Sequence, residues 1–272
     1  MKLIFVTLLL SFAAINTMAD NTVPVSRIEY EKKQQFASSR VSVEFPLGED
    51  SPLRRALVDY IFEVCRITNP GVKVKHPSSS CDETVFRKYL EDYTTTLCSL
   101  CAEDQHDYAL SFGEEGKPYQ VEWFSNLFVN KAADTDKYVS YIAYNGEFCG
   151  GAHDQRGSGA IVLRKADGVR IDSIFKEGLE EKMQPLLWKY LIVSEAPEDA
   201  AEYRAKINKF LEANYGIRDY LHLGSCFLAP DGIHIMYQPL EICFWPDEPE
   251  IVIPFDEAKP FLTDEALRLI SR

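Results

Sequence analysis

Residues 144–154 read YNGEFCGGAHD and hold a thiol, an imidazole and a carboxylate within six positions. These are Cys149, His153 and Asp154, and the pair Gly150–Gly151 directly follows the cysteine. A thiol with an imidazole is the core of cysteine-based nucleophilic catalysis, and the three groups together could ligate a metal ion. The glycines allow a third interpretation, because glycine adopts the positive φ angles that a sharp turn needs.

Spacing favours the turn over either kind of chemistry. His153 lies four residues after Cys149, and in an extended or turning chain that separation need not bring the two side chains together. Asp154 is badly placed to orient the imidazole, because it directly follows His153. Zinc sites take ligands from paired motifs, and His222 and His234 lie in strand-like contexts without such spacing. We therefore expect no metal and no cofactor, and a strand-end turn that leads His153 to a chosen place.

The seven cysteines form a second group that could do chemistry. Cys98 and Cys101 have the CxxC spacing of redox pairs and of half a zinc site. The motif falls late in a helical stretch, however, and the chain has no second CxxC. We expect structural disulfides or plain buried thiols, with one thiol left over by the odd count. Cys226 and Cys243, which flank a hairpin region, are one candidate pair.

Hydrophobic periodicity predicts the elements that must position these residues. Runs of strands interrupted by blocks of helices indicate an α+β fold rather than an alternating parallel α/β fold. We expect antiparallel sheets, and a break near 131–137 that divides the chain into halves. Strands are predicted at 25–36, 40–45, 108–112, 119–130, 138–148, 159–164, 169–171, 227–229, 233–237 and 251–254, and helical spacing covers 53–64, 82–101, 179–191, 201–211 and 263–270.

The N-terminal residues 1–19 have the pattern of a signal peptide. Lys2 precedes an apolar stretch at 3–15, and Thr17-Met18-Ala19 is an acceptable cleavage site. The apolar stretch is short of the roughly 20 residues that a membrane span needs, and no later window approaches that length. The sequence therefore predicts export, to a periplasmic or extracellular location, and no integral membrane segment in the mature chain.

Composition limits the partners of the exported chain. Apolar residues make up 46% of the sequence, which suffices for a real core. The whole chain has 29 basic and 42 acidic residues, and removal of Lys2 with the signal peptide leaves a net charge of −14. Such acidity argues against binding to nucleic acid or anionic membrane surfaces, and favours either simple solubility or a cationic partner.

The order of several short motifs resembles the extracytoplasmic domain of RsiV-type anti-sigma factors. Residues 20–131, in which VSVEFPL leads into a helix, resemble the module that precedes this domain and occurs in PdaC-type peptidoglycan deacetylases, and residues 132–272 resemble the RsiV-like domain itself. The resemblance implies an α+β binding domain with helices packed on one side of its sheets. The motifs of the second half are GGAH (150–153), IDSIF (171–175), FLAPDGIHIMYQPLEI (227–242) and IVIPFDEAKPFL (251–262).

Several departures from the family pattern, among them Phe255 in place of the last tyrosine, fall where a ligand-facing surface would be. Asp154 replaces a glycine, and Leu240 replaces a tyrosine within the stretch that matches at Tyr237 and Glu241. Residues 243–246 also depart from the family continuation. His153, Asp154, Tyr237 and Glu241 are therefore candidate ligand-binding residues, with Gly150 and Gly151 as the structural part of the motif.

The resemblance implies binding rather than catalysis. RsiV recognises lysozyme, so the expected partner is a cationic lysozyme-like cell-wall hydrolase, or cell-wall glycan itself. The chain shows neither a cytoplasmic segment nor a polysaccharide deacetylase domain, so sigma regulation and deacetylation do not carry over. The alternative is an envelope hydrolase or deacetylase-like enzyme that uses His153 with Asp154 or Glu241. A scaffold role in the envelope is a third possibility.

Overall fold

A computed structural model describes residues 21–112, 121–195, 198–244 and 248–271. The predicted signal peptide at 1–19 lies outside the described residues. The same holds for the turn predicted at 113–118, for Pro197 before the fourth helix, and for residues 245 and 246 of the family pattern. No helix within the described ranges is long and apolar enough to cross a membrane.

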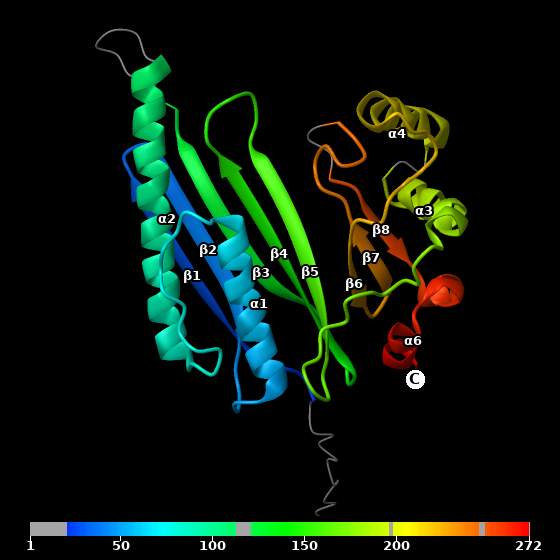
Figure 1. The fold of residues 1–272 in the computed structure, drawn as a ribbon, viewed down its shortest axis with the longest axis horizontal. Helices are drawn as coiled ribbons and strands as arrows, with labels where there is room; N and C mark the ends of the chain where they lie inside the picture. The colour runs from blue at the N-terminus through cyan, green and yellow to red at the C-terminus, as the bar shows by residue number, and fades with distance from the viewer. Residues whose placement is uncertain (1–20, 113–120, 196–197, 245–247, 272) are drawn as a thin grey trace, which may run out of the picture.

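Residues 25–164 include the five strands of one sheet, in the order β1-β2-β3-β4-β5 (Figure 1). The predicted hairpin of β1 and β2 is confirmed, and β3, β4 and β5 follow one another as an antiparallel meander. Residues 131 and 132, where the sequence predicts a division into two modules, lie inside β3. The bounds are β1 Val25–Gln34, β2 Ala37–Pro46, β3 Trp123–Asp134, β4 Tyr138–Phe148 and β5 Gln155–Arg164.

The two halves of this sheet join through one parallel pair, β2 with β3, which the sequence did not predict. A parallel pair needs a long crossover, and the helices α1 (Pro52–Thr68) and α2 (Glu83–Phe112) supply it. The strand predicted at 108–112 is wrong, because these residues are the last turns of α2. Tertiary contacts outweigh their strand-like alternation: Ala109 is buried, and the ring of Tyr108 packs against Trp123.

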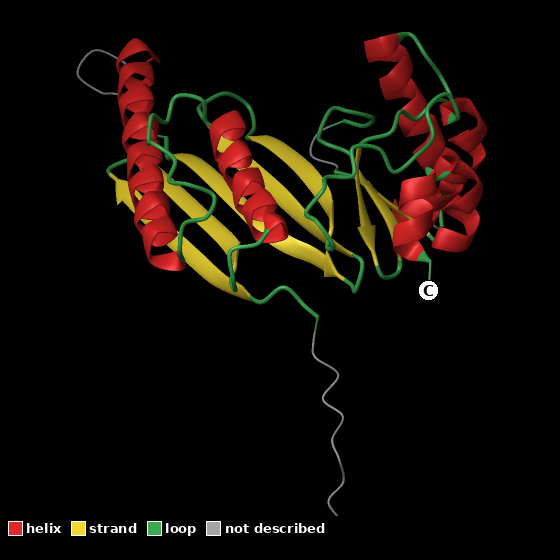
Figure 2. Ribbon diagram, turned by 60° about the horizontal axis from the view of Figure 1, so that its bottom comes forward, coloured by secondary structure: helices red, strands yellow, loops and turns green. Residues whose placement is uncertain are grey.

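Both crossover helices cover one face of the five-stranded sheet (Figure 2). Helix α1 begins as predicted at Ser51, whose hydroxyl accepts a hydrogen bond from the backbone N–H of Arg54 at 3.2 Å. Strand β4 shows how the faces divide. Val139 and Tyr141 are fully buried among the residues of α1 and α2, whereas Tyr138 joins the core on the opposite face.

A second, three-stranded antiparallel sheet, β6-β7-β8, packs on that opposite face. The Ser140 hydroxyl of β4 donates to the Leu228 carbonyl of β6 at 2.7 Å, so the two sheets are in direct contact. The remaining helices lie beyond the small sheet (Figures 1 and 2), and the fold is α+β with antiparallel-rich sheets. The bounds are β6 Ser225–Ala229, β7 Gly232–Met236, β8 Glu250–Ile253, α3 Glu180–Glu195, α4 Ala200–Tyr215, α5 Phe255–Ala258 and α6 Asp264–Ile270.

Local signals in the second half are largely confirmed. The hairpin at Pro230–Gly232 joins β6 to β7, Gly216 ends α4 with a φ of 68°, and Thr263 caps α6. The strand predicted at 169–171 is reduced to an isolated bridge between Leu163 and Arg170. All seven cysteines are free thiols, so neither the CxxC pair nor Cys226 with Cys243 forms a disulfide in this structure.

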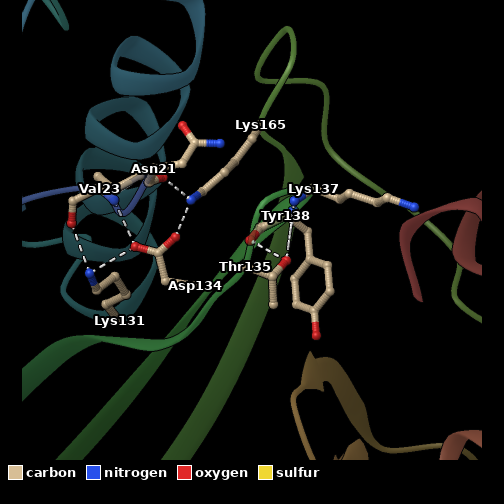
Figure 3. A network of polar contacts seen from close by, with 8 residues as sticks. All are labelled: Asn21, Val23, Lys131, Asp134, Thr135, Lys137, Tyr138 and Lys165. Atoms are coloured by element: carbon tan, nitrogen blue, oxygen red, sulfur yellow. Dashed lines mark hydrogen bonds and ion pairs between the residues drawn. The ribbon is translucent and has the colours of Figure 1, made fainter. Parts of the chain in front are cut away.

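A buried carboxylate fastens the start of the described chain to the large sheet (Figure 3). Asp134, whose side chain is 8% exposed, accepts hydrogen bonds from the Val23 backbone N–H at 2.7 Å and from the Lys131 ammonium at 2.9 Å. Its other oxygen pairs with Lys165, which also donates to the Asn21 carbonyl. The residues just after the predicted cleavage site are therefore part of the folded domain.

Candidate functional site

The glycine motif forms the turn between β4 and β5. Strand β4 ends at Phe148, and Gly150 and Gly151 follow with φ angles of 85° and 102°, which favour glycine. A Cβ atom on Gly150 would lie 3.0 Å from the Tyr108 ring, whereas one on Gly151 would meet nothing within 4 Å. At position 150, glycine is required both by the backbone conformation and by the packing against α2. At position 151, only the backbone conformation requires it.

This turn presents His153 to solvent. The imidazole is exposed, and its Nδ1 atom lies 3.1 Å from the backbone carbonyl of Asp154. The Asp154 carboxylate accepts a hydrogen bond from Arg156 Nε at 2.7 Å, and Arg156 also donates to Glu248 at 2.8 Å. Arg156, held by Asp154, therefore ties the start of β5 to the segment that precedes β8.

Tyr237 and Glu241 follow β7 and both contact His222, which was not predicted to belong to a site. The buried Tyr237 hydroxyl donates to the backbone carbonyl of His222 at 2.8 Å. One Glu241 oxygen lies 2.6 Å from His222 Nε2, and the other accepts the backbone N–H of Gln238 at 2.7 Å. No local motif links His222 to Glu241, because the β6–β7 hairpin separates them in sequence.

Gln238 connects this group to β5. Held by Glu241, it donates from its side chain to the Ser158 carbonyl at 2.9 Å. The matching stretch of the family pattern therefore contacts the large sheet through its glutamine, which was not among the predicted ligand-binding residues. Tyr237 is buried beneath it and serves as support.

The thiols near these groups are not activated for attack. Burial raises the pKa of Cys226 to about 12, with a further contribution from Glu241, and the thiol lies 3.2 Å from the Gly224 carbonyl. Burial likewise raises the pKa of Cys149 to about 11, and the Glu147 and Asp104 carboxylates add to the shift. Both groups are thiols at neutral pH, and a thiol is a poor nucleophile.

An open cleft of about 400 Å³ lies between α1, β5 and Gln238. Its floor along β5 consists of small residues, Gly157, Ser158, Gly159 and Ala160, so no bulky side chain of this edge strand covers its backbone there. A neighbouring cleft of about 290 Å³ continues along β5 past Ala160 and shares Arg170 and Ser225 with the first. We call the two together the β5 cleft.

The β5 cleft is acidic. Arg170 and Lys176 are the basic side chains that line it, and the acidic ones outnumber them: Glu63, Asp172, Glu177 and Glu180. Arg170 is moreover held by Glu63, at 3.4 Å between nitrogen and oxygen. His153 and Asp154 do not line this cleft. Within the described ranges, no three His, Cys, Asp or Glu side chains are grouped so that they could hold a metal ion.

Comparison with known proteins identifies the fold. No protein-family model matches the chain, and no curated protein matches it. Among solved structures, a DUF3298 family member from Bacteroides fragilis matches with a TM-score of 0.61 and 19% identity, over 90% of this chain and 95% of that one. A DUF3298 family protein from Pseudomonas aeruginosa matches with a TM-score of 0.52 and 15% identity, over 90% and 96%.

These likenesses establish the architecture and no more, since both identities are low. DUF denotes a domain of unknown function, so the two neighbours supply no ligand or reaction. The DUF3298 fold is related to RsiV-type and PdaC-type domains. The resemblance inferred from the motifs is therefore supported at the level of the fold.

Proposed function

We propose that this protein is an exported, non-enzymatic binding domain that recognises a cationic protein, of which a lysozyme-like cell-wall hydrolase is the expected example. The observation that carries the proposal is the open acidic β5 cleft, whose floor is an edge strand with small side chains. Edge strands and clefts of this kind bind extended segments of a partner through accessible backbone groups.

Charge supports the choice of a cationic partner. The net charge of −14 after signal-peptide removal would attract a basic protein over long range and speed its association at low salt. The charge that lines the cleft is negative, like the net charge of the whole molecule, so a basic partner is attracted at short range as well. An anionic ligand would be repelled at both stages.

The engagement of the candidate residues argues against the enzyme alternative. The Asp154 carboxylate is occupied by Arg156, and Glu241 is occupied by His222 and the Gln238 backbone. A general acid or base needs a proton-transfer group that faces substrate. These carboxylates instead fix the positions of main-chain segments.

Cell-wall glycan is a second candidate, favoured by the polar groups in the cleft. Asn145, Ser158 and Gln238 line it beside Tyr60, whose hydroxyl donates to the Gly159 carbonyl at 3.3 Å. Amides and hydroxyls beside an aromatic ring suit a sugar. A glycan would bind with little dependence on salt, because neutral sugars have no charge for the cleft to attract.

The test measures binding of the purified mature protein to a lysozyme and to soluble peptidoglycan fragments at low and high ionic strength. We expect lysozyme binding that weakens with salt. The double variant Asp172→Asn/Glu177→Gln should weaken it roughly fivefold, as two rim charges would. The matched control Glu198→Gln/Glu202→Gln removes the same charge from the start of α4 and the residues just before it, and should change binding less than twofold.

Three outcomes would count against the proposal. Salt-independent binding to peptidoglycan fragments alone would select the glycan candidate. Equal weakening by both double variants would show that net charge acts without the β5 cleft. Absence of binding to either ligand at low ionic strength would remove both candidates.

Export is tested separately, by N-terminal sequencing of secreted material. We expect Asp20 as the first residue.

A further inference from the structure

Cys149, in the turn between β4 and β5, and Cys101 of α2 line the same cleft of about 230 Å³, which lies between residues 68–72, α2 and the end of β4. Burial raises the pKa of Cys101 and Cys149 adds to the shift, so the two groups are near enough to interact. The residues on either side of Cys149 support this placement. Phe148 packs on the small core of Cys101, Trp123 and Ala37, and Gly150 lies against Tyr108 of the same helix.

The other cysteines are placed differently. Cys98, the other half of the CxxC motif, is fully buried, and its thiol points to the Ala37 carbonyl of β2 at 3.8 Å. Cys65 is fully buried beneath α2, where Tyr93 donates to its backbone carbonyl. Neither of them lines the cleft that Cys101 and Cys149 share. The CxxC spacing therefore reflects the helical repeat, and the partner of Cys101 comes from the glycine motif.

We propose that Cys101 and Cys149 form an intramolecular disulfide that fastens the turn with His153 to α2 when the protein meets a disulfide oxidant, such as oxidised glutathione or an oxidoreductase. Exported compartments supply such oxidants. The inference does not depend on the ligand of the β5 cleft. A failure to bind lysozyme or glycan would leave it untouched.

The exchange proceeds in two balanced steps. Cys149 is the exposed thiol of the pair, so the small fraction of it that is ionised at neutral pH reaches the oxidant's disulfide first, forms a mixed disulfide and releases one thiolate. The Cys101 thiolate then attacks the Cys149 sulfur and releases the second. The protein loses two protons and two electrons, and the oxidant is reduced to two thiols.

The turn can supply the movement that bond formation needs. A disulfide brings the two Cβ atoms to about 3.8 Å. Gly150 and Gly151 follow Cys149 directly, and a backbone of adjacent glycines adjusts at low cost. Bond formation would draw the turn onto α2 and limit the positions open to His153.

The experiment equilibrates the full mature protein with a glutathione redox buffer, blocks free thiols by alkylation, and maps peptides by mass spectrometry without reduction. We expect a linked peptide pair that contains Cys101 and Cys149, lighter by two hydrogen atoms than the separate peptides. The melting temperature of the oxidised protein should rise by several degrees, and C149S should abolish the rise. The control C81S should preserve it.

Peptide mapping of the unaltered protein shows whether the Cys101–Cys149 disulfide forms, even if a variant folds poorly. Complete alkylation of both thiols after equilibration in an oxidising buffer would overturn the proposal. So would a link between Cys101 and Cys98, or between Cys149 and a cysteine of a second molecule.

Discussion

His234 shows how a single side chain responds to opposing effects in this protein. Burial lowers its pKa, but hydrogen bonds to Glu250 at 2.6 Å and to Asp231 at 2.9 Å outweigh burial and raise the pKa above the ordinary value. The bond to His234 also lowers the pKa of Asp231, against the effect of its own partial burial. When protonated, the imidazole donates to both carboxylates and so bridges the β6–β7 turn and β8.

The first prediction concerns His234→Gln. A raised folded pKa means that the stabilisation from His234 is fully present below the unfolded pKa of about 6.5 and is lost as pH rises through the folded value. Urea unfolding should show a loss of about 1–2 kcal/mol at about pH 5.5 and a smaller loss at about pH 8.5. His106→Gln, at an exposed position, is the control. A loss that grows with pH would contradict this account.

At the same scale, the candidate site was only partly predictable. Tyr237 and Glu241 lie near each other, as a few residues in a turn cannot separate far. His222 joins them only once the β6–β7 hairpin has formed, and Gln238 gains its role only when the small sheet packs near β5. Contacts of this kind depend on tertiary packing, which local spacing does not encode.

The turn between β4 and β5 gives the second prediction, at the scale of the element. Gly150→Ala would place a Cβ atom against Tyr108 in a backbone conformation that alanine rarely adopts. We expect a loss of about 2–3 kcal/mol of unfolding free energy, from strain and overpacking together. The matched variant Gly151→Ala has the same backbone constraint in open space and should lose only about 1 kcal/mol. Equal losses would show that the contact with Tyr108 does not matter.

The N-terminal anchor gives the third prediction. Asp134→Asn removes one negative charge from between two buried or half-buried lysines, Lys131 and Lys165. Breaking such a network from one side should cost about 3–5 kcal/mol in urea unfolding, because two cations lose their partner. Asp136→Asn, at an exposed position two residues away, should change stability by less than about 0.5 kcal/mol. Hydrogen exchange near Val23 should quicken only in the first variant.

Helices and strands could be predicted where local sequence determines them. They could not be predicted where packing against residues distant in sequence determines them. The hairpin of β1 and β2, helix α1 with its Ser51 cap, and the cap of α6 follow from alternation and capping residues. Residues 108–112 alternate like a strand but extend α2, because Trp123 covers Tyr108. The parallel pairing of β2 with β3 has no local signature at all.

On the scale of the whole molecule, four layers follow one another: α1 and α2, the large sheet, the small sheet, and the C-terminal helices (Figures 1 and 2). The order explains why β4 is buried on both faces, with Tyr141 toward one core and Tyr138 toward the other. It also leaves the β5 edge between the sheets, where the acidic cleft lies. The cleft proposed to bind a partner therefore lies at the edge of the large sheet, and the buried core lies on its two faces.

The parallel pair has a consequence for how the chain reaches this state. Synthesis delivers β2 long before β3, so Ala37 is made well before its partner Trp123. During that interval the hairpin of β1 and β2 has an open edge carrying Val41, Val43 and Phe45, the kind of edge that pairs with other chains. The parallel pair therefore forms only after a long loop closure, the kind of contact that slows folding.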